Sequence, residues 1–182
     1  IPDNRFMKSA GVQDSRELAT AYLDTVVGDH NDTPGASRQR RLAYVEEAPN
    51  MIDFLASEGI RLRRLPSWPD YYDAHGESVP GRTVVSELFD SNQLGEWKSR
   101  LRPGFLPVPA NLDEAMQLPY LKRSWASRKM LARIIGRTLL SRLSGKHLVT
   151  AGQALQGQRL HRAIQTGTDD RINAGVKQLL QE

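Results

Sequence analysis

The chain is divided by one stretch, Trp68-Pro-Asp-Tyr-Tyr-Asp-Ala-His-Gly-Glu-Ser-Val-Pro-Gly-Arg82, which separates a helical first third from a basic helical last third. Pro69 disfavours helical backbone at Trp68, so the stretch is predicted to be a loop or a strand edge. The paired phenols of Tyr71 and Tyr72 can donate or accept hydrogen bonds and can transfer protons if their pKa is lowered. The alternative is that both rings pack in a core with their hydroxyls satisfied.

Length and composition indicate one domain without disulfides or metal. The 182 residues suffice for a real core, and the chain has no cysteine and only four scattered histidines, so we expect no metal site. A net charge of +4, from 25 Lys and Arg against 21 Asp and Glu, does not by itself indicate nucleic acid. No apolar run reaches the roughly 20 residues that span a bilayer.

Two helices are predicted before the central stretch. The first is capped by Asp14-Ser15 and ends at Gly28. Its inner face is expected to hold Leu18, Ala19, Tyr22, Leu23 and Val26. The second begins at Ser37, breaks or restarts at Pro49 and ends near Gly59. Its candidate buried residues are Leu42, Val45, Ile52 and Leu55.

The predicted fold class is α+β, mainly helical, with a few short strands near residues 60–66, 82–86 and 171–180. The first of these segments alternates apolar and basic residues, and Thr83-Val84-Val85 in the second is β-branched. A turn-rich connector is predicted over 31–36, and a short loop or hairpin over 73–80. Such a mixture suits a small sheet surrounded by helices.

The longest helical pattern runs from Leu121 to Leu143. Its apolar residues fall mostly on one side: Trp125, Leu131, Ile134, Ile135, Leu139 and Leu143. Bases without intervening acids lie on the other side: Lys122, Arg123, Arg128, Lys129, Arg133, Arg137 and Arg142. The favoured interpretation is a packed helix whose charged face meets water. The alternative is attachment to an anionic membrane surface or to a partner.

Several motifs resemble the FAD-dependent 3-ketosteroid Δ1-dehydrogenases, which belong to the fumarate-reductase-like flavoproteins. Trp68-Pro-Asp-Tyr-Tyr with Gly81-Arg-Thr is similar to the family's aromatic-Pro/Ser-Asp-Tyr-Tyr and Gly-Arg-Ser motifs. Ile1-Pro-Asp-Asn, Phe89-Asp, Leu94-Gly-Glu-Trp, Leu101-Arg-Pro and the run from Thr150 to Leu160 resemble further family elements. Thr83 in place of Ser, and Asp73-Ala-His-Gly-Glu in place of a Pro-rich loop, depart from the family and leave the substrate open.

The resemblance implies roles for individual residues. Tyr71 matches the first tyrosine of the motif, whose hydroxyl supports a tyrosine base that lies elsewhere in the family's chain. Trp68, Tyr72 and Arg82 would neighbour the substrate, with a structural ion pair as an equally good interpretation of Arg82. Ile1, Pro2, Gln153 and Leu155 would border the cofactor FAD.

The resemblance also implies a piece of a longer bacterial protein, since the chain opens on Ile1 without a Met or targeting segment. Residues 1–149 would form the substrate-binding region, and 150–182 would return into an FAD-binding domain. No Gly-x-Gly-x-x-Gly turn is present to seat a pyrophosphate, so FAD is expected only in the longer protein, and the chain alone is expected to be inactive.

The expected partners are a steroid or other lipophilic small molecule and the remaining FAD-binding domain. Nucleic acid is not expected, and the alternatives include peripheral membrane contact and a homodimer. The expected location is the cytoplasm. Two alternatives to a steroid dehydrogenase are a fumarate-reductase-like dehydrogenase of another substrate and a basic module that binds a membrane or a partner.

Overall fold

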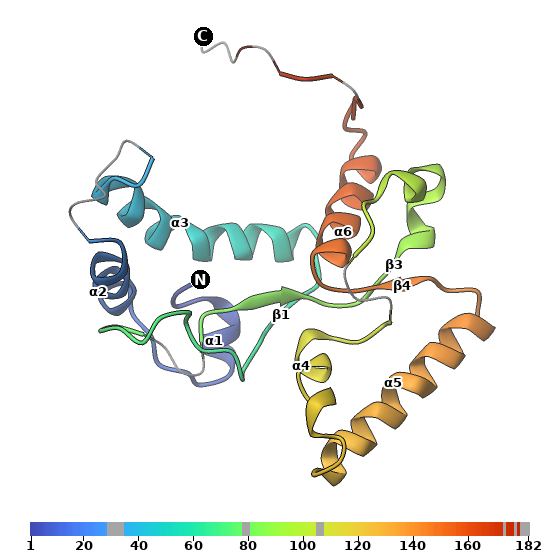
Figure 1. The fold of residues 1–182 in the computed structure, drawn as a ribbon. Helices are drawn as coiled ribbons and strands as arrows, with labels where there is room; N and C mark the ends of the chain where they lie inside the picture. The colour runs from blue at the N-terminus through green and yellow to red at the C-terminus, as the bar shows by residue number, and fades with distance from the viewer. Residues whose placement is uncertain (29–34, 78–80, 105–107, 173, 177, 179–182) are drawn as a thin grey trace.

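The fold is mainly helical, with two small antiparallel sheets near its middle (Figure 1). The computed structural model describes residues 1–28, 35–77, 81–104, 108–172, 174–176 and 178. Its α-helices are α1 (Arg5–Ser9), α2 (Arg16–Val27), α3 (Arg38–Ser57), α4 (Leu112–Ala115), α5 (Trp125–Leu143) and α6 (Ala151–Gln165). Its 3-10 helices are η2 (Ser91–Arg100) and η3 (Leu118–Tyr120). Its strands are β1 (Leu62–Arg64), β2 (Val84–Ser86), β3 (Phe89–Asp90) and β4 (Leu148–Val149). The predicted α+β class is confirmed.

The ends of α2 and α3 follow from local sequence. The Ser15 hydroxyl accepts a hydrogen bond from the Leu18 amide, and the Ser37 hydroxyl accepts one from the Arg40 amide. Gly28, which ends α2, has a φ of 68°, and Gly59, just past α3, has a φ of +83°. Because this left-handed region favours glycine, both helices end where the sequence predicts.

The interior of α3 differs from the sequence prediction. The helix continues through Pro49, where a break or restart was expected. A proline removes one backbone hydrogen bond, and here the flanking turns hold the helix together without it. Val45 and Ile52 are buried as predicted, whereas Leu42 on α3 and Leu18 on α2 are exposed. The two helices pack on each other and on few other elements, so each buries a narrow face.

Two of the three predicted strands are present. β1 pairs antiparallel with β2, placing Leu62 opposite Ser86 and Arg64 opposite Val84. β3 and β4 form a second antiparallel pair that places Phe89 opposite Val149. The strand expected over 171–180 is wrong for the described residues of that segment, which are exposed and extend away from the other elements (Figure 1). The predicted connector over 31–34 and the hairpin end at 78–80 lie outside the described residues.

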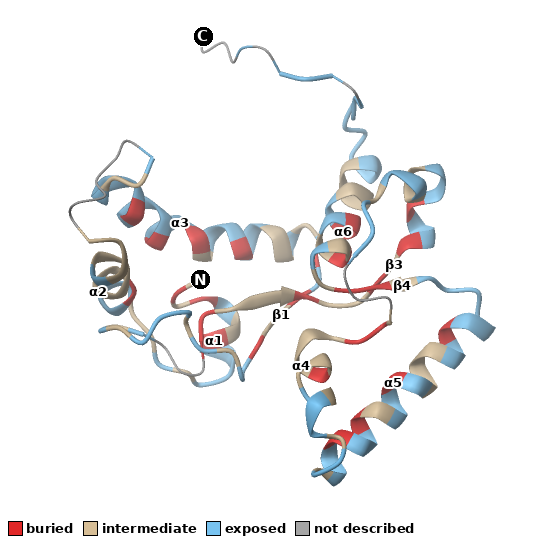
Figure 2. Cartoon of the chain, viewed as in Figure 1, coloured by how far each residue is buried: buried red, intermediate tan, exposed pale blue. Residues whose placement is uncertain are grey.

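The core consists of three small apolar clusters (Figure 2). Phe89, Leu94, Val149 and Ala154 form one, and Ile52, Ile60 and Leu62 form the second. The third joins Ala110 to Met130 and Ile134 of α5. α6 contacts β2, β3 and η2, so it connects both sheets.

α5 begins at Trp125, and of the apolar side that the sequence favoured only Ile134 belongs to its buried face. The buried residues are Ser127, Met130, Ile134 and Ser141. Trp125, Ile135, Leu139 and Leu143, which were expected to pack, are exposed. The physical reason is that α5 is covered on one side only, by α4, η3 and the segment before them.

None of the helices in the described parts of the chain combines the length and the apolar character that crossing a membrane requires.

Candidate active site

The stretch from Trp68 to Arg82 is a loop closed at its base. The Gly81 amide donates to the Trp68 carbonyl at 2.9 Å, and the Leu65 amide donates to the Thr83 carbonyl at 2.9 Å. A Cβ at Gly81 would lie 2.0 Å from the Trp68 carbonyl oxygen, so only glycine allows this approach. The loop predicted from Pro69 is therefore confirmed, and its two ends are joined by β1 and β2.

Arg82 holds the loop to the helices beneath it. Its Nε and Nη2 donate to the two carboxylate oxygens of Asp14 at 2.8 and 2.7 Å. Its Nη1 donates to Asp70 at 2.8 Å, and Nη2 also donates to the Gly76 carbonyl at 2.9 Å. One guanidinium thus joins Asp14, two residues before α2, to Asp70, the residue before Tyr71, and to Gly76 on the far side of the loop.

This ion cluster lies away from solvent. The Arg82 and Asp14 side chains are 6% and 2% exposed, and Asp70 is 12% exposed. Burial alone would raise the pKa of Asp14, but the hydrogen bonds from Arg82 and from the Asp3 amide, together with the positive charge of Arg82, hold that pKa below its ordinary value. Burial likewise opposes the charge of Arg82, and the hydrogen bonds to Asp14 and Asp70, together with the negative charges of these two residues, overcome it and raise the pKa of Arg82. Asp14 and Arg82 are therefore both charged at neutral pH.

The loop also contacts α2 through its backbone. The Tyr72 amide donates to the Tyr22 hydroxyl at 3.0 Å, and the Arg82 guanidinium lies 6.0 Å from the centre of the Tyr22 ring. Gly76 has a φ of +83°, and a Cβ there would lie 2.2 Å from the Leu18 carbonyl oxygen. These contacts fix the loop backbone closely against the helix.

The two tyrosine side chains point outward from this fixed backbone. Tyr71 is 84% exposed and Tyr72 is 61% exposed, so the interpretation of both as core residues is wrong. The Trp68 ring meets the Tyr71 ring edge to face, with 6.3 Å between centres. Accessible phenols on a fixed loop can hydrogen-bond to a ligand or to another protein group, and can serve in proton transfer where the phenolate is stabilised.

The remaining residues expected at the site fall in two places. Ile1 and Leu155 both pack against the cluster of Ile52, Ile60 and Leu62, and Pro2 is buried beside Ile1. The Ile1 amino group donates to the Arg82 carbonyl at 2.8 Å. The structure thus brings Ile1 and Pro2 close to the base of the loop from Trp68 to Arg82, which we call the tyrosine loop.

Gln153 lies apart from them, at the first turn of α6. Its side-chain oxygen accepts a hydrogen bond from the Gly104 amide at 3.1 Å. It borders a groove with a volume of about 590 Å³, which is also lined by Pro103, Thr150 and Leu160. Gln153 and Leu155 are therefore two residues apart in sequence but face different surroundings.

Sequence reasoning missed two residues that build the site. Asp14 was assigned to helix capping, but its carboxylate binds Arg82 and accepts the Asp3 amide. Tyr22 was assigned to the inner face of α2 and instead supports the loop at Tyr72. A buried arginine requires acidic partners, and this is the only sequence signal that could have prompted a search for Asp14.

Comparison with known proteins gives a consistent result. No family model matches the chain. A 3-oxosteroid 1-dehydrogenase of Mycobacterium tuberculosis is 31% identical over 163 residues, which cover 86% of this chain and 28% of that protein. The Comamonas testosteroni protein of the same name is 29% identical over 195 residues, covering 100% of this chain and 33% of its own length.

A solved structure is also similar. It is a 3-ketosteroid delta1-dehydrogenase from Sterolibacterium denitrificans in complex with 1,4-androstadiene-3,17-dione, with a TM-score of 0.74 and 26% identity. The match covers 92% of this chain and 30% of that one. The resemblance to ketosteroid dehydrogenases is therefore confirmed in sequence and in fold, and the chain spans about a third or less of these proteins.

Proposed function

We propose that this chain forms the substrate-binding region of an FAD-dependent oxidoreductase that removes the hydrogens from carbons 1 and 2 of a 3-ketosteroid. In this proposal residues 1–149 contribute the substrate side, and residues 150–182 lead into an FAD-binding domain. The observation that carries the proposal is the ion-fixed tyrosine loop, which presents Tyr71 to solvent in a chain whose relatives are steroid dehydrogenases.

Tyr71 is the catalytic residue of the proposal, acting in removal of the proton from ring A. A free phenol has a pKa near 10, so a phenolate formed at neutral pH requires a hydrogen-bonding neighbour that stabilises it. The Tyr71 hydroxyl fits this task as donor to a second tyrosine, because its ring is exposed while its backbone is fixed by Asp70 and Arg82. Trp68 and Tyr72 then border the steroid as apolar and aromatic contacts.

Arg82 serves this proposal as a positioning residue rather than as a ligand contact. Its five N–H groups make four hydrogen bonds to Asp14, Asp70 and Gly76. Its side chain is also buried, so a substrate would have to displace these partners to reach it. The structure thus favours the ion-pair interpretation of Arg82 over direct substrate binding.

The residues of this chain do not by themselves fit FAD. Ile1 and Leu155 are directed into an apolar cluster, and Gln153 is engaged with Gly104 at a separate groove. The sequence also lacks the glycine-rich turn whose amides would hold a pyrophosphate. We therefore place the flavin on a domain outside these residues and assign no step to it here.

Dye-coupled oxidation of a 3-ketosteroid tests the proposal. The substrate is the 1,2-dihydro form of 1,4-androstadiene-3,17-dione, and the protein is this chain joined to an FAD-binding domain of its relatives' type. We expect steroid-dependent dye reduction by the flavin-loaded protein, and neither dye reduction nor retained FAD with the 182-residue chain alone. A flavin-loaded protein that leaves every 3-ketosteroid unchanged while oxidising another compound would overturn the proposal.

A further inference from the structure

The Tyr71 side chain is held in place mainly through its backbone. The side chain is 84% exposed, and among the described residues its ring has one aromatic neighbour, Trp68, which it meets edge to face. A hydroxyl that takes part in proton transfer must stay within hydrogen-bond reach of its partner, and a displacement of about 1 Å can cost roughly a hundredfold in rate. The backbone on either side of Tyr71 therefore decides where its hydroxyl lies.

The residues that flank Tyr71 are anchored by different partners. Before Tyr71, the Asp70 carboxylate accepts a hydrogen bond from Arg82 at 2.8 Å. After it, the Tyr72 amide donates to the Tyr22 hydroxyl at 3.0 Å. That amide belongs to the planar group that begins at the Tyr71 Cα, so its hydrogen bond sets the backbone angle ψ of Tyr71. Tyr22 thus acts on the position of Tyr71 as directly as the ion cluster does.

α2 supports the tyrosine loop along one side of the helix (Figure 1). Asp14, Leu18 and Tyr22 are four residues apart, so each lies about one helical turn from the next. The Arg82 guanidinium binds Asp14 and lies 6.0 Å from the centre of the Tyr22 ring. A Cβ at Gly76 would lie 2.2 Å from the Leu18 carbonyl oxygen and 2.8 Å from the Tyr22 amide nitrogen. The Tyr22 hydroxyl therefore reaches the loop from a helix that already contacts it at two other points.

We propose that Tyr22 is a positioning residue for Tyr71. Its hydroxyl fixes the peptide group between Tyr71 and Tyr72, and so holds the Tyr71 hydroxyl within reach of the tyrosine base. This inference rests on the proposed function, in which Tyr71 supports that base. Tyr22 acts through the backbone of the loop rather than on the substrate.

The surroundings of this hydrogen bond separate a positioning role from a purely stabilising one. The contact between the Tyr72 amide and the Tyr22 hydroxyl is exposed, so water can replace the hydroxyl as acceptor with little loss of stability. A water molecule satisfies the amide, but it is not attached to α2 and does not fix the peptide group. Loss of the Tyr22 hydroxyl should therefore affect turnover more than it affects unfolding.

Tyr22→Phe in the flavin-loaded protein tests the proposal. The change keeps the ring beside Arg82 and removes only the hydroxyl. For a 3-ketosteroid we expect kcat to fall about three- to tenfold, with KM nearly unchanged and the pH optimum moved upward, because the tyrosine base loses part of its support. The midpoint of thermal unfolding should move by less than about 3 °C. A purely stabilising residue would move the unfolding midpoint and leave the pH optimum in place.

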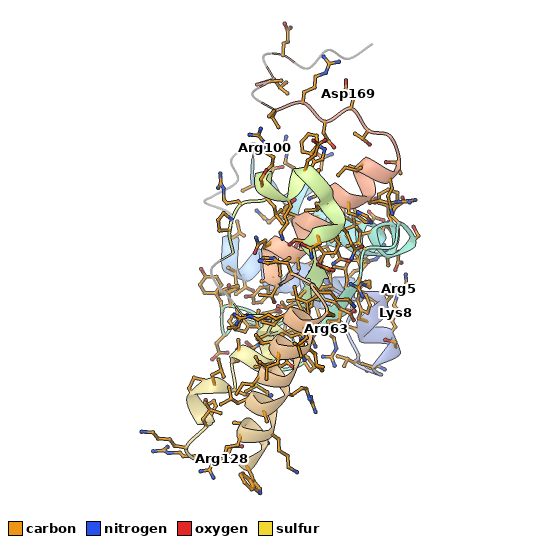
Figure 3. The ribbon with its side chains drawn as sticks, turned by 90° about the vertical axis from the view of Figure 1, so that its right-hand side faces the viewer. Arg5, Lys8, Arg63, Arg100, Arg128 and Asp169 are labelled. Carbon is orange, nitrogen blue, oxygen red and sulfur yellow. The ribbon has the colours of Figure 1, made fainter. Side chains whose placement is uncertain are left out.

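Hydrogen exchange measures the loop without reference to turnover. Exchange in peptides that span Tyr72 should be at least about threefold faster in Tyr22→Phe. Tyr120→Phe is the matched control, because it removes the same hydroxyl from another part of the molecule. Tyr120 is 59% exposed, and the carbonyl of its neighbour Leu121 accepts a hydrogen bond from Arg128, which projects at one extremity of the molecule (Figure 3). This control should change neither exchange at Tyr72 nor kcat.

Combining Tyr22→Phe with Tyr71→Phe separates positioning from general damage. If Tyr22 acts through the Tyr71 hydroxyl, the double variant should turn over no more slowly than Tyr71→Phe alone. A further fall in the double variant, unchanged exchange at Tyr72, or an unchanged kcat in Tyr22→Phe where Tyr71→Phe lowers it, would overturn the role of Tyr22 and leave the proposed function standing. If the flavin-loaded protein oxidises no 3-ketosteroid, the proposed function itself fails, and the role of Tyr22 fails with it.

Discussion

Arg82 attaches the tyrosine loop to the rest of the molecule and Arg137 attaches α5, and the two attachments differ. Arg82 fixes the tyrosine loop through Asp14, Asp70 and a carbonyl, with both Arg82 and Asp14 less than a tenth exposed. Arg137 fixes α5 through Glu114 and the Pro109 carbonyl, with 23% of its side chain exposed. The first guanidinium ties down both sides of a loop, whereas the second attaches one face of a helix.

The two kinds of attachment leave different surfaces exposed on the tyrosine loop and on α5. A loop tied at Asp70 and Gly76 holds Tyr71 in a defined place, as proton transfer requires. A helix attached along one face leaves its opposite face open. Breaking each attachment separately should therefore affect stability to different extents.

The largest effect is expected for Arg82→Met. Removing the guanidinium takes away the positive charge that faces the buried carboxylates of Asp14 and Asp70, and breaking a buried ion pair in this way typically costs about 3–5 kcal/mol. Urea denaturation followed by circular dichroism measures the loss. A free energy of unfolding within about 1 kcal/mol of the unchanged chain would show that the cluster contributes little.

Two further variants show whether charge or geometry matters at Arg82. Adding Asp14→Asn and Asp70→Asn to Arg82→Met should recover part of the loss, because the two buried negative charges that faced the guanidinium are then removed with it. Arg82→Lys should fall between the two, since it retains the charge but cannot reproduce the fork of hydrogen bonds. If the triple variant is less stable than Arg82→Met, the loss of the positive charge beside the buried carboxylates is not the cause of the destabilisation.

A smaller effect is expected for Arg137→Met. Glu114 keeps the hydrogen bond that it accepts from the Asn111 amide, and the pair is closer to water. We expect a cost of roughly 1–2 kcal/mol in the free energy of unfolding. A cost that equals or exceeds that of Arg82→Met in the same denaturation series would contradict the comparison.

Acid should weaken both attachments. Hydrogen bonds from Arg137 outweigh burial and lower the pKa of Glu114, and those from Arg82 lower the pKa of Asp14. A carboxyl whose pKa is lower in the folded than in the unfolded chain stabilises the fold above its ordinary pKa, near 4, and loses that contribution as pH falls through the lowered value.

The free energy of unfolding should therefore fall between about pH 5 and pH 3. Measured over this range, Asp14→Asn and Glu114→Gln should each reduce the slope of the free energy of unfolding against pH. Unchanged slopes in both variants would mean that other carboxyls cause the acid sensitivity.

Sequence predicted the features that depend on near neighbours. Ser15, Ser37, Gly28 and Gly59 end their helices through contacts within a few residues, so their roles could be read from the sequence. The break predicted at Pro49 is absent, because the helical turns on either side hold α3 together across the proline. The tyrosine loop itself was predicted from Pro69 and from the resemblance.

What sequence could not predict is set by distant contacts. Asp14 and Arg82 are 68 residues apart, and no local pattern connects them. On α5, periodicity predicted an apolar side that includes Ile134 but could not show that the buried face would be formed by Met130 and Ile134 while the rest of that side is exposed. That face is determined by contacts with Ala110, in the loop before α4, and with Glu114 of α4.

Turnover of a Tyr71→Phe variant of the flavin-loaded protein tests the central claim most directly. Because Tyr71 is 84% exposed, loss of its hydroxyl should change the free energy of unfolding by less than about 0.5 kcal/mol. Loss of a hydrogen bond to an ionising group should lower kcat by roughly ten- to a hundredfold, leave KM nearly unchanged and move the pH optimum upward. Tyr72→Phe should have a smaller effect. If Tyr71→Phe leaves kcat and its pH profile unchanged, Tyr71 takes no part in proton removal and the account is contradicted.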